Sequence, residues 1–146
     1  MSPEQLFSLS TMLVLPGWLL LVFLPRWRWS ARLVAPVVIP AALACVYVFL
    51  IATHFGKSEG DFNSLAGVGR LFQNPYNLLA GWIHYLAFDL FVGSWEVRDA
   101  QRVGLHHLLV VPCLVLTFLF GPVGLLLYFA LRAALRRRLL VGGEAG

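Results

Sequence analysis

Apolar residues fill four long stretches of the chain, and shorter polar links separate them. A helix needs about 20 apolar residues to cross a bilayer. The pattern therefore predicts transmembrane helices over about 6–24, 33–53, 76–95 and 107–131. It also predicts a polar loop over 56–74 and a basic tail over 132–146. We expect an all-α fold with one domain over 1–146, an integral membrane four-helix transmembrane bundle.

The last stretch is longer than the others. At about 25 residues it exceeds the hydrocarbon thickness, so we expect it to tilt, or to kink at Pro112 or within 121–124. Four spans would place both termini and the 56–74 loop on one side of the membrane. That side would hold six Lys and Arg residues against five on the other, which slightly favours cytoplasmic termini.

Two polar links differ in character. Loop 56–74 is long, and such loops are mobile or functional, often as lids. Its spaced apolar residues, Phe62 and Leu65 among them, predict that it lies partly in the membrane interface. A shorter hydrophilic link over 96–105 is expected to join the third and fourth spans.

Composition supports the membrane assignment. Hydrophobic residues make up 60% of the chain, charged residues 12%, and the mean hydropathy is +0.80. A soluble domain would be about 25% charged. The net charge is +4, but the arginines stand at helix ends and in the tail, which indicates contact with lipid headgroups rather than nucleic acid. Cys45 and Cys113 lie in apolar stretches and are interpreted as small core residues.

The third span differs from the others because it carries Asn77, His84 and Asp89 and leads directly into Glu96 and Asp99. Ionisable groups at membrane depth are costly, so a helix that keeps them usually turns them toward a protein interior, a cavity or a ligand. We therefore expect this helix to form the floor of any chemical site.

Helical spacing sorts these residues into two lines. At about 100° per residue, Trp82, Tyr85, Asp89 and Glu96 share one line. A second line holds Asn77, Gly81, His84, Phe88 and Trp95. His84 and Asp89 are about 140° apart, so they cannot pair directly within one helix. Both could still line the edges of one cavity between helices.

Acid–base chemistry is the reaction type that these residues suggest. A carboxylic acid removed from water is a competent proton donor, and a histidine can complement it as base. We predict Asp89 as the acid, Tyr85 as its partner and His84 as the base, with no redox cofactor. The predicted substrate-binding residues are Asn77, Trp82, Phe88, Trp95 and Glu96. The alternative is that Asp89 bonds to a neighbouring helix or an arginine and has only a packing role.

A metal site is a weaker possibility, and we expect none. His106 and His107, with Asp89, Glu96 and Asp99, have the donor types of a carboxylate–histidine site for iron or zinc. Adjacent histidines point about 100° apart, so only one would face such a site. The more ordinary role for the pair is an interfacial cap that is hydrogen-bonded to the Glu96 to Asp99 link.

Three runs resemble a known family: FNSLAGVGRLF (62–72), AGWIHYLAFDLFVGSWEVRDA (80–100) and HHLLVVPCLVLTFLFGPVGLLLY (106–128). They are similar to the abscisic-acid-deficient-type membrane proteins of plants and bacteria. The resemblance implies a role in carotenoid metabolism, since plant members are needed to form neoxanthin, a xanthophyll, from violaxanthin. That conversion is an isomerisation in which a 5,6-epoxide opens to an allenic alcohol.

The resemblance also sets expectations for substrate and location. We expect a bacterial member, multi-pass in the inner membrane, with a lipid-soluble substrate such as a carotenoid, another isoprenoid or a lipid. Its partners would be the membrane and either a second copy of the chain or other carotenoid enzymes. The leading hypothesis is an isomerase similar to neoxanthin synthase. The alternatives are a non-enzymatic carotenoid- or lipid-binding or scaffold protein, and, third, a proton-linked carrier.

Overall fold

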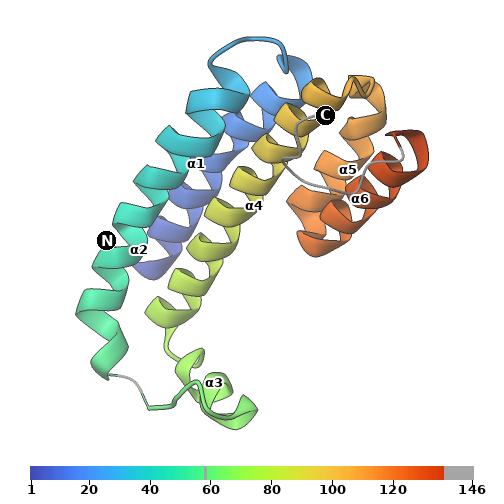
Figure 1. The fold of residues 1–146 in the computed structure, drawn as a ribbon. Helices are drawn as coiled ribbons and strands as arrows, with labels where there is room; N and C mark the ends of the chain where they lie inside the picture. Colours follow the sequence, from blue (N-terminus) through green and yellow to red (C-terminus); the bar gives the residue numbers. More distant parts are fainter. Residues whose placement is uncertain (58, 137–146) are drawn as a thin grey trace.

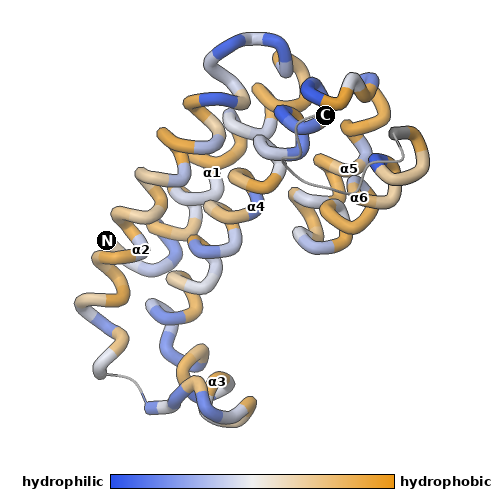
Figure 2. The backbone as a smooth tube through the Cα atoms, viewed as in Figure 1, coloured by the Kyte–Doolittle hydropathy of each residue, from blue (hydrophilic) through white to orange (hydrophobic). Residues whose placement is uncertain are grey.

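The computed structural model describes residues 1–57 and 59–136, and every regular element among them is a helix. Three long rods pack side by side (Figure 1). They are α1 (Pro3–Phe23), the π-helix η1 (Ser30–Val38) with α2 (Ile39–His54), and α4 (Pro75–Val103). These three rods are long and apolar enough to cross a membrane. Figure 2 shows the many hydrophobic residues along these rods and the hydrophilic link between α1 and η1.

Local sequence explains where the rods begin. Ser2 and Gln5 form a capping box at the start of α1, which satisfies two backbone N–H groups that the helix leaves free. The second rod begins as a π-helix. This π-helix contains Pro36, which has no backbone N–H and so removes one regular hydrogen bond. Asn74 caps α4 through its side chain, and Pro75 occupies the first helical position, which tolerates proline.

The third rod, α4, is longer than predicted. It continues through Glu96 and Asp99 to Val103 and ends at Gly104, which has a left-handed φ of 72°. The expected hydrophilic link over 96–105 is therefore wrong. Glu96 and Asp99 are buried because neighbouring helices supply their partners, which hydropathy alone does not reveal.

Loop 56–74 contains more regular structure than expected. A single 3-10 turn, η2 (Phe55–Lys57), overlaps its start, and a short helix, α3 (Leu65–Leu71), lies within it. Ser64 caps α3 by accepting a hydrogen bond from the Gly67 N–H at 2.9 Å. In Figure 1 this segment lies at the end of the molecule where α4 begins.

The predicted fourth span over 107–131 is wrong as a single helix. The chain forms α5 (His107–Phe120) and α6 (Pro122–Arg136), which lie against each other as a hairpin (Figure 1). Helices of 14 and 15 residues are about 21–23 Å long, short of the hydrocarbon thickness of about 30 Å. The described residues thus form three candidate spans and a hairpin, and a four-helix bundle is not found among them.

Two glycines explain the reversal. Gly121 has a φ of 46°, a conformation that most side chains disfavour, and it was within the segment expected to kink. Gly124 lets the two helices touch, because a Cβ there would overlap the Thr117 backbone nitrogen. The chain therefore turns back where the hydropathy pattern continues without a break.

The hairpin changes the expected topology. Gly121 lies against Asp89, which is 14 residues from each end of α4, and α6 then runs back to the level of Asp99. The end of α6 therefore lies at the same end of the molecule as the α1–η1 link, whereas α1 starts at the opposite end. For the described residues, the expectation that both termini lie on one side is wrong. The expected basic tail is α6 as far as Arg136, and 137–146 lie outside the described residues.

This topology also alters the charge balance. The end with the α1–η1 link carries Arg26, Arg28, Arg32, Arg98 and Arg102, whereas the connection at the opposite end carries Lys57 and Arg70. An excess of Lys and Arg marks the cytoplasmic side. The rule now favours the α1–η1 link as the cytoplasmic end.

We predict opposite labelling of the two ends by a membrane-impermeant maleimide. In a chain with Cys45→Ala and Cys113→Ala, Leu135→Cys should react from the same face as Arg28→Cys. Ser2→Cys should react from the other face. Labelling of Leu135→Cys together with Ser2→Cys would indicate four full spans and contradict the hairpin.

Candidate functional site

Three polar residues of α4 face the α5–α6 hairpin. Tyr85, Asp89 and Glu96 belong to the line that helical spacing predicted, and each meets a different part of the hairpin. Trp82, the fourth member of that line, instead lies 36% exposed beside α1, where its indole N–H donates to Thr11 Oγ1 at 3.4 Å. We call the face formed by Tyr85, Asp89 and Glu96 the carboxylate face.

Tyr85 is held by the end of α5. Its hydroxyl donates a hydrogen bond to the Phe118 carbonyl oxygen at 2.8 Å. The last four carbonyls of a helix lack partners within it, and α5 ends at Phe120, so Tyr85 satisfies one of these groups. This contact positions the phenol ring, which also lies within reach of the Asp89 carboxyl group.

Asp89 lies where the hairpin turns. Its side chain is half-buried, and a Cβ at Gly121 would come within 2.9 Å of Oδ1. Its Oδ2 is buried and has no hydrogen-bond partner among the described residues. Each end of α4 is about 21 Å away along the helix axis, which places this carboxyl group near the middle of the span.

Glu96 is the second carboxyl group of this face. Its side chain is fully buried and Oε1 accepts a hydrogen bond from Thr117 Oγ1 at 3.0 Å. Its Oε2 has no hydrogen-bond partner in the described chain. Seven residues separate it from Asp89, or about 10.5 Å along the axis. The face thus holds two carboxyl groups, each with one buried oxygen that makes no hydrogen bond within residues 1–57 and 59–136.

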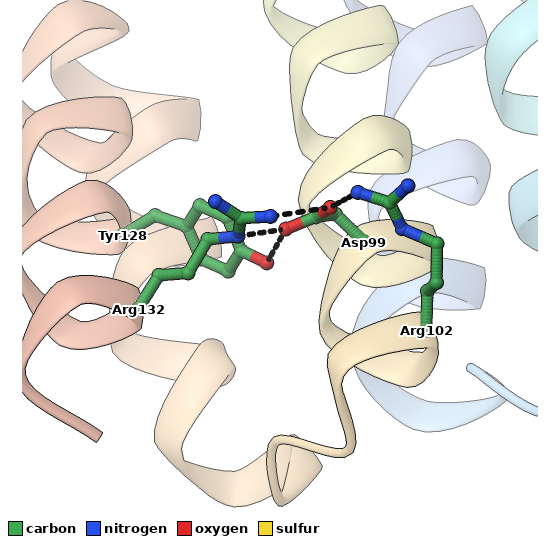
Figure 3. A network of polar contacts seen from close by, with 4 residues as sticks. All are labelled: Asp99, Arg102, Tyr128 and Arg132. Atoms are coloured by element: carbon green, nitrogen blue, oxygen red, sulfur yellow. Dashed lines mark hydrogen bonds and ion pairs between the residues drawn. The ribbon is translucent and has the colours of Figure 1, made fainter. Parts of the chain in front are cut away.

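An ion-pair network lies next to the carboxylate face, beyond Glu96 and near the end of α4 (Figure 3). Arg132 Nε of α6 lies 2.7 Å from Asp99 Oδ2, and the Tyr128 hydroxyl donates to the same oxygen at 2.7 Å. Arg102 Nη2 is 2.7 Å from Asp99 Oδ1. The Asp99 and Arg132 side chains are both 2% exposed. Removing such charges from water is costly unless they meet each other, so this pair ties α6 to α4.

The network corrects the expected place of Arg132 and bears on one candidate ligand of the metal site that the sequence does not favour. Arg132, expected in a basic tail on the membrane surface, is buried between helices. Asp99 was a candidate metal ligand, but both of its carboxylate oxygens are engaged by arginine and tyrosine.

The two candidate histidines for a metal site lie at the start of α5. His106 is the exposed N-cap residue, and its side chain makes no capping hydrogen bond. His107 Nε2 lies 2.9 Å from the Val22 carbonyl oxygen. Within residues 1–57 and 59–136, no three His, Cys, Asp or Glu side chains are grouped closely enough to hold a metal ion.

His84 lies on a different side of α4 from Asp89. Its ring stacks on Phe88 with centroids 4.5 Å apart and faces Tyr47 of α2 at 6.1 Å. Asp89 instead meets Gly121 of the hairpin. The structure therefore does not bring the predicted acid and base together.

The predicted substrate-binding residues are also dispersed. Asn77 and His84 line a small aromatic cavity between α2, α3 and α4. Phe88 is 59% exposed, and Trp95 packs edge-on against Tyr128 and Phe129 of α6. Only Glu96 shares the carboxylate face with Asp89.

Sequence reasoning missed the residues that the hairpin contributes to the site. Gly124, Tyr128 and Arg132 recur every four residues, so they share one face of α6. A glycine, a phenol and a charge at this spacing indicate a helix face that packs on a polar partner. Hydropathy alone, however, places these three residues in a membrane span and a basic tail.

Comparison with known proteins identifies the family. A model of the family described as ABA DEFICIENT 4-like matches residues 5–128, from α1 into α6. This chain belongs to the ABA DEFICIENT 4-like family. The matched region includes Asp89, Glu96 and Asp99, so the carboxylate face lies within the part shared with the family model.

One curated relative is also similar to this ABA DEFICIENT 4-like chain. It is the chloroplastic protein ABA DEFICIENT 4 of Arabidopsis thaliana, with 26% identity over 145 residues. The match covers 92% of this chain and 64% of the relative, so the chain spans less than two thirds of the relative's length. No solved structure matches the chain.

We predict that the buried ion pair dominates the stability of the hairpin. Asp99→Asn should lower the free energy of unfolding by about 3–5 kcal/mol, because Arg132 would stay buried without the Asp99 charge. Arg102→Gln is the matched control and should cost at most about 1 kcal/mol, since its side chain is 48% exposed. Denaturant titration in detergent micelles measures both. A small effect of Asp99→Asn would contradict this role.

Proposed function

We propose that this protein is a membrane isomerase of carotenoid or isoprenoid metabolism that opens a carotenoid epoxide or a related lipid by acid–base chemistry. Family membership supports the metabolic class, and the similarity to a protein named for abscisic acid deficiency agrees with it. The observation that carries the proposal is Asp89, a half-buried carboxyl group at the middle of the candidate span α4 that lies against the turn of the hairpin.

The location of Asp89 suits a substrate dissolved in the bilayer. Apolar surroundings favour the neutral form of a carboxyl group, which is the form that donates a proton. Tyr85 beside it is anchored to the Phe118 carbonyl oxygen, which limits the movement of the acid and its neighbour. The side chain is only half-buried, so a lipid-soluble molecule can approach it from the hydrocarbon.

One carboxyl group can perform both proton transfers of an isomerisation. Asp89 donates its proton to the epoxide oxygen as the carbon–oxygen bond breaks. The carboxylate then removes a proton from the carbon chain, and the electrons of that C–H bond form the new double bond. The product keeps the mass of the substrate and Asp89 recovers its proton, so neither oxidant nor reductant is required.

The geometry favours this scheme over a division of labour between Asp89 and His84. The two side chains face different neighbouring helices, so one reacting centre would have to contact both sides of α4. Glu96 lies on the same face as Asp89 but is fully buried, so it does not touch the substrate in this scheme.

Binding without conversion is the second candidate function. The observation that favours it is the aromatic cavity between α2, α3 and α4, which is separate from the carboxylate face. In that case the protein would co-purify with a pigment whose structure stays unchanged over time.

Replacement of Asp89 provides the direct test. In membranes supplied with violaxanthin, Asp89→Asn should reduce conversion by a factor on the order of 10² or more, because an amide cannot transfer the proton. Chromatography of the extracted pigment gives the converted fraction at equal protein levels. Glu59→Gln makes the same carboxyl-to-amide change at an exposed position and should convert normally. Full activity of Asp89→Asn would overturn the proposal.

A further inference from the structure

We propose that a cavity beside the α1–η1 link binds the phosphate group of an anionic phospholipid, with Arg26 as the residue that recognises its charge. The cavity has a volume of about 930 Å³ and lies between the end of α1, the end of α4 and the start of α5. These three helix ends lie together at one end of the molecule (Figure 1). Asp89 lies near the middle of α4, so this site is separate from the proposed isomerase site.

Two hydrogen bonds hold the walls of the cavity together. Gln101 Nε2 donates to the Pro25 carbonyl oxygen at 2.6 Å, which ties α4 to the α1–η1 link. His107 Nε2 lies 2.9 Å from the Val22 carbonyl oxygen, and this nitrogen carries the hydrogen because a carbonyl can only accept. The second bond ties α5 to α1. The cavity is therefore formed before a ligand enters, which lowers the entropic cost of binding.

The polar groups of the cavity favour an anion. Arg26, His106 and His107 contribute to its lining, and no lining residue in the described chain is Asp or Glu. The exposed Arg26 side chain makes neither an ion pair nor a hydrogen bond within residues 1–57 and 59–136. A guanidinium group binds phosphate oxygens strongly through charge-assisted hydrogen bonds. The start of α5 adds to this, because its N-cap residue His106 makes no capping hydrogen bond and backbone N–H groups there remain available.

The charges around the cavity act in the same direction. Asp99, near the end of α4, is already engaged by Arg102 and Arg132, so it does not neutralise Arg26. A group of arginines at one end of a protein raises the local concentration of anions. The excess of arginine also favours this end as the cytoplasmic one, and the cytoplasmic leaflet is the one that carries anionic lipids.

The rim of the cavity favours a lipid over free phosphate. Phe23, Trp27 and Leu108 line the cavity, and all three side chains are exposed. Tryptophans are enriched at the membrane–water interface, which is the level of the phosphate headgroups. A phospholipid would place its phosphate beside Arg26 and its acyl chains along the apolar side chains. Inorganic phosphate has no part that would contact them.

Two phospholipids with the same acyl chains test the site. Dioleoylphosphatidylglycerol is anionic, whereas dioleoylphosphatidylcholine has no net charge. Native mass spectrometry of the full chain, titrated with each lipid in detergent, gives the dissociation constant of the first bound lipid. The wild-type protein should bind phosphatidylglycerol roughly tenfold more tightly, about the effect of one hydrogen bond to a charged group. Arg26→Gln should abolish this preference. Equal affinities of the wild-type protein for the two lipids would overturn the proposal.

Arg28→Gln is the matched control. It removes the same charge from the same link, but Arg28 does not line the cavity, and its guanidinium group lies 4.4 Å from the centroid of the Trp29 ring. This variant should keep the preference for phosphatidylglycerol. An equal loss of preference in Arg26→Gln and Arg28→Gln would indicate general attraction to a basic surface and overturn the proposed site.

A second variant and a soluble competitor complete the test. His106→Asp introduces a negative charge at the cavity, and α5 should still form because Asp is a favourable N-cap residue. The preference for phosphatidylglycerol should be lost, and its survival would contradict the proposal. Inorganic phosphate in excess should leave the lipid bound, since it lacks the acyl chains that contact the rim. Displacement of the lipid would mean that the cavity takes free phosphate, and the lipid assignment would fail.

Discussion

The fold depends on one buried ion pair, between Asp99 of α4 and Arg132 of α6. Both side chains are almost fully excluded from solvent, where either charge without its partner would strongly destabilise the fold. Their contact requires the chain to reverse after α5, since a straight helix over 107–131 would carry Arg132 to the other side of the membrane. With α6 fastened at the level of Asp99, the turn at Gly121 falls beside Asp89. The hairpin therefore determines the surroundings of the proposed acid.

Helix α4 serves two separate environments because its opposite sides meet different neighbours. The hairpin covers Tyr85, Asp89 and Glu96, where two carboxyl oxygens have no protein partner in the described chain. On the other side, α2 and α3 enclose an aromatic cavity with Asn77 at its edge. A single span with two carboxyl groups on one side and an aromatic cavity on the other agrees with the lipid-soluble substrate that we propose.

Hydropathy predicted the three long rods because each is apolar over a length that can cross a membrane. Helical spacing also grouped Tyr85, Asp89 and Glu96 on one line. The hairpin was not predictable in this way, since 107–131 is uniformly apolar and the reversal depends on the backbone of Gly121 and the contact at Gly124. Arg132 was assigned to a tail because its partner, Asp99, lies 33 residues earlier in the chain. Spacing placed His84 and Asp89 about 140° apart, but only the neighbouring helices show that they occupy different environments.

The most direct test of the central claim is the mass of the product. Pigments extracted from a host that makes an epoxide carotenoid, with and without the wild-type protein, can be compared by chromatography and mass spectrometry. A carboxyl group that both gives and recovers the proton predicts a new pigment with the mass of its precursor. A product of altered mass would indicate oxidation or hydration and contradict the account, as would the absence of any new pigment.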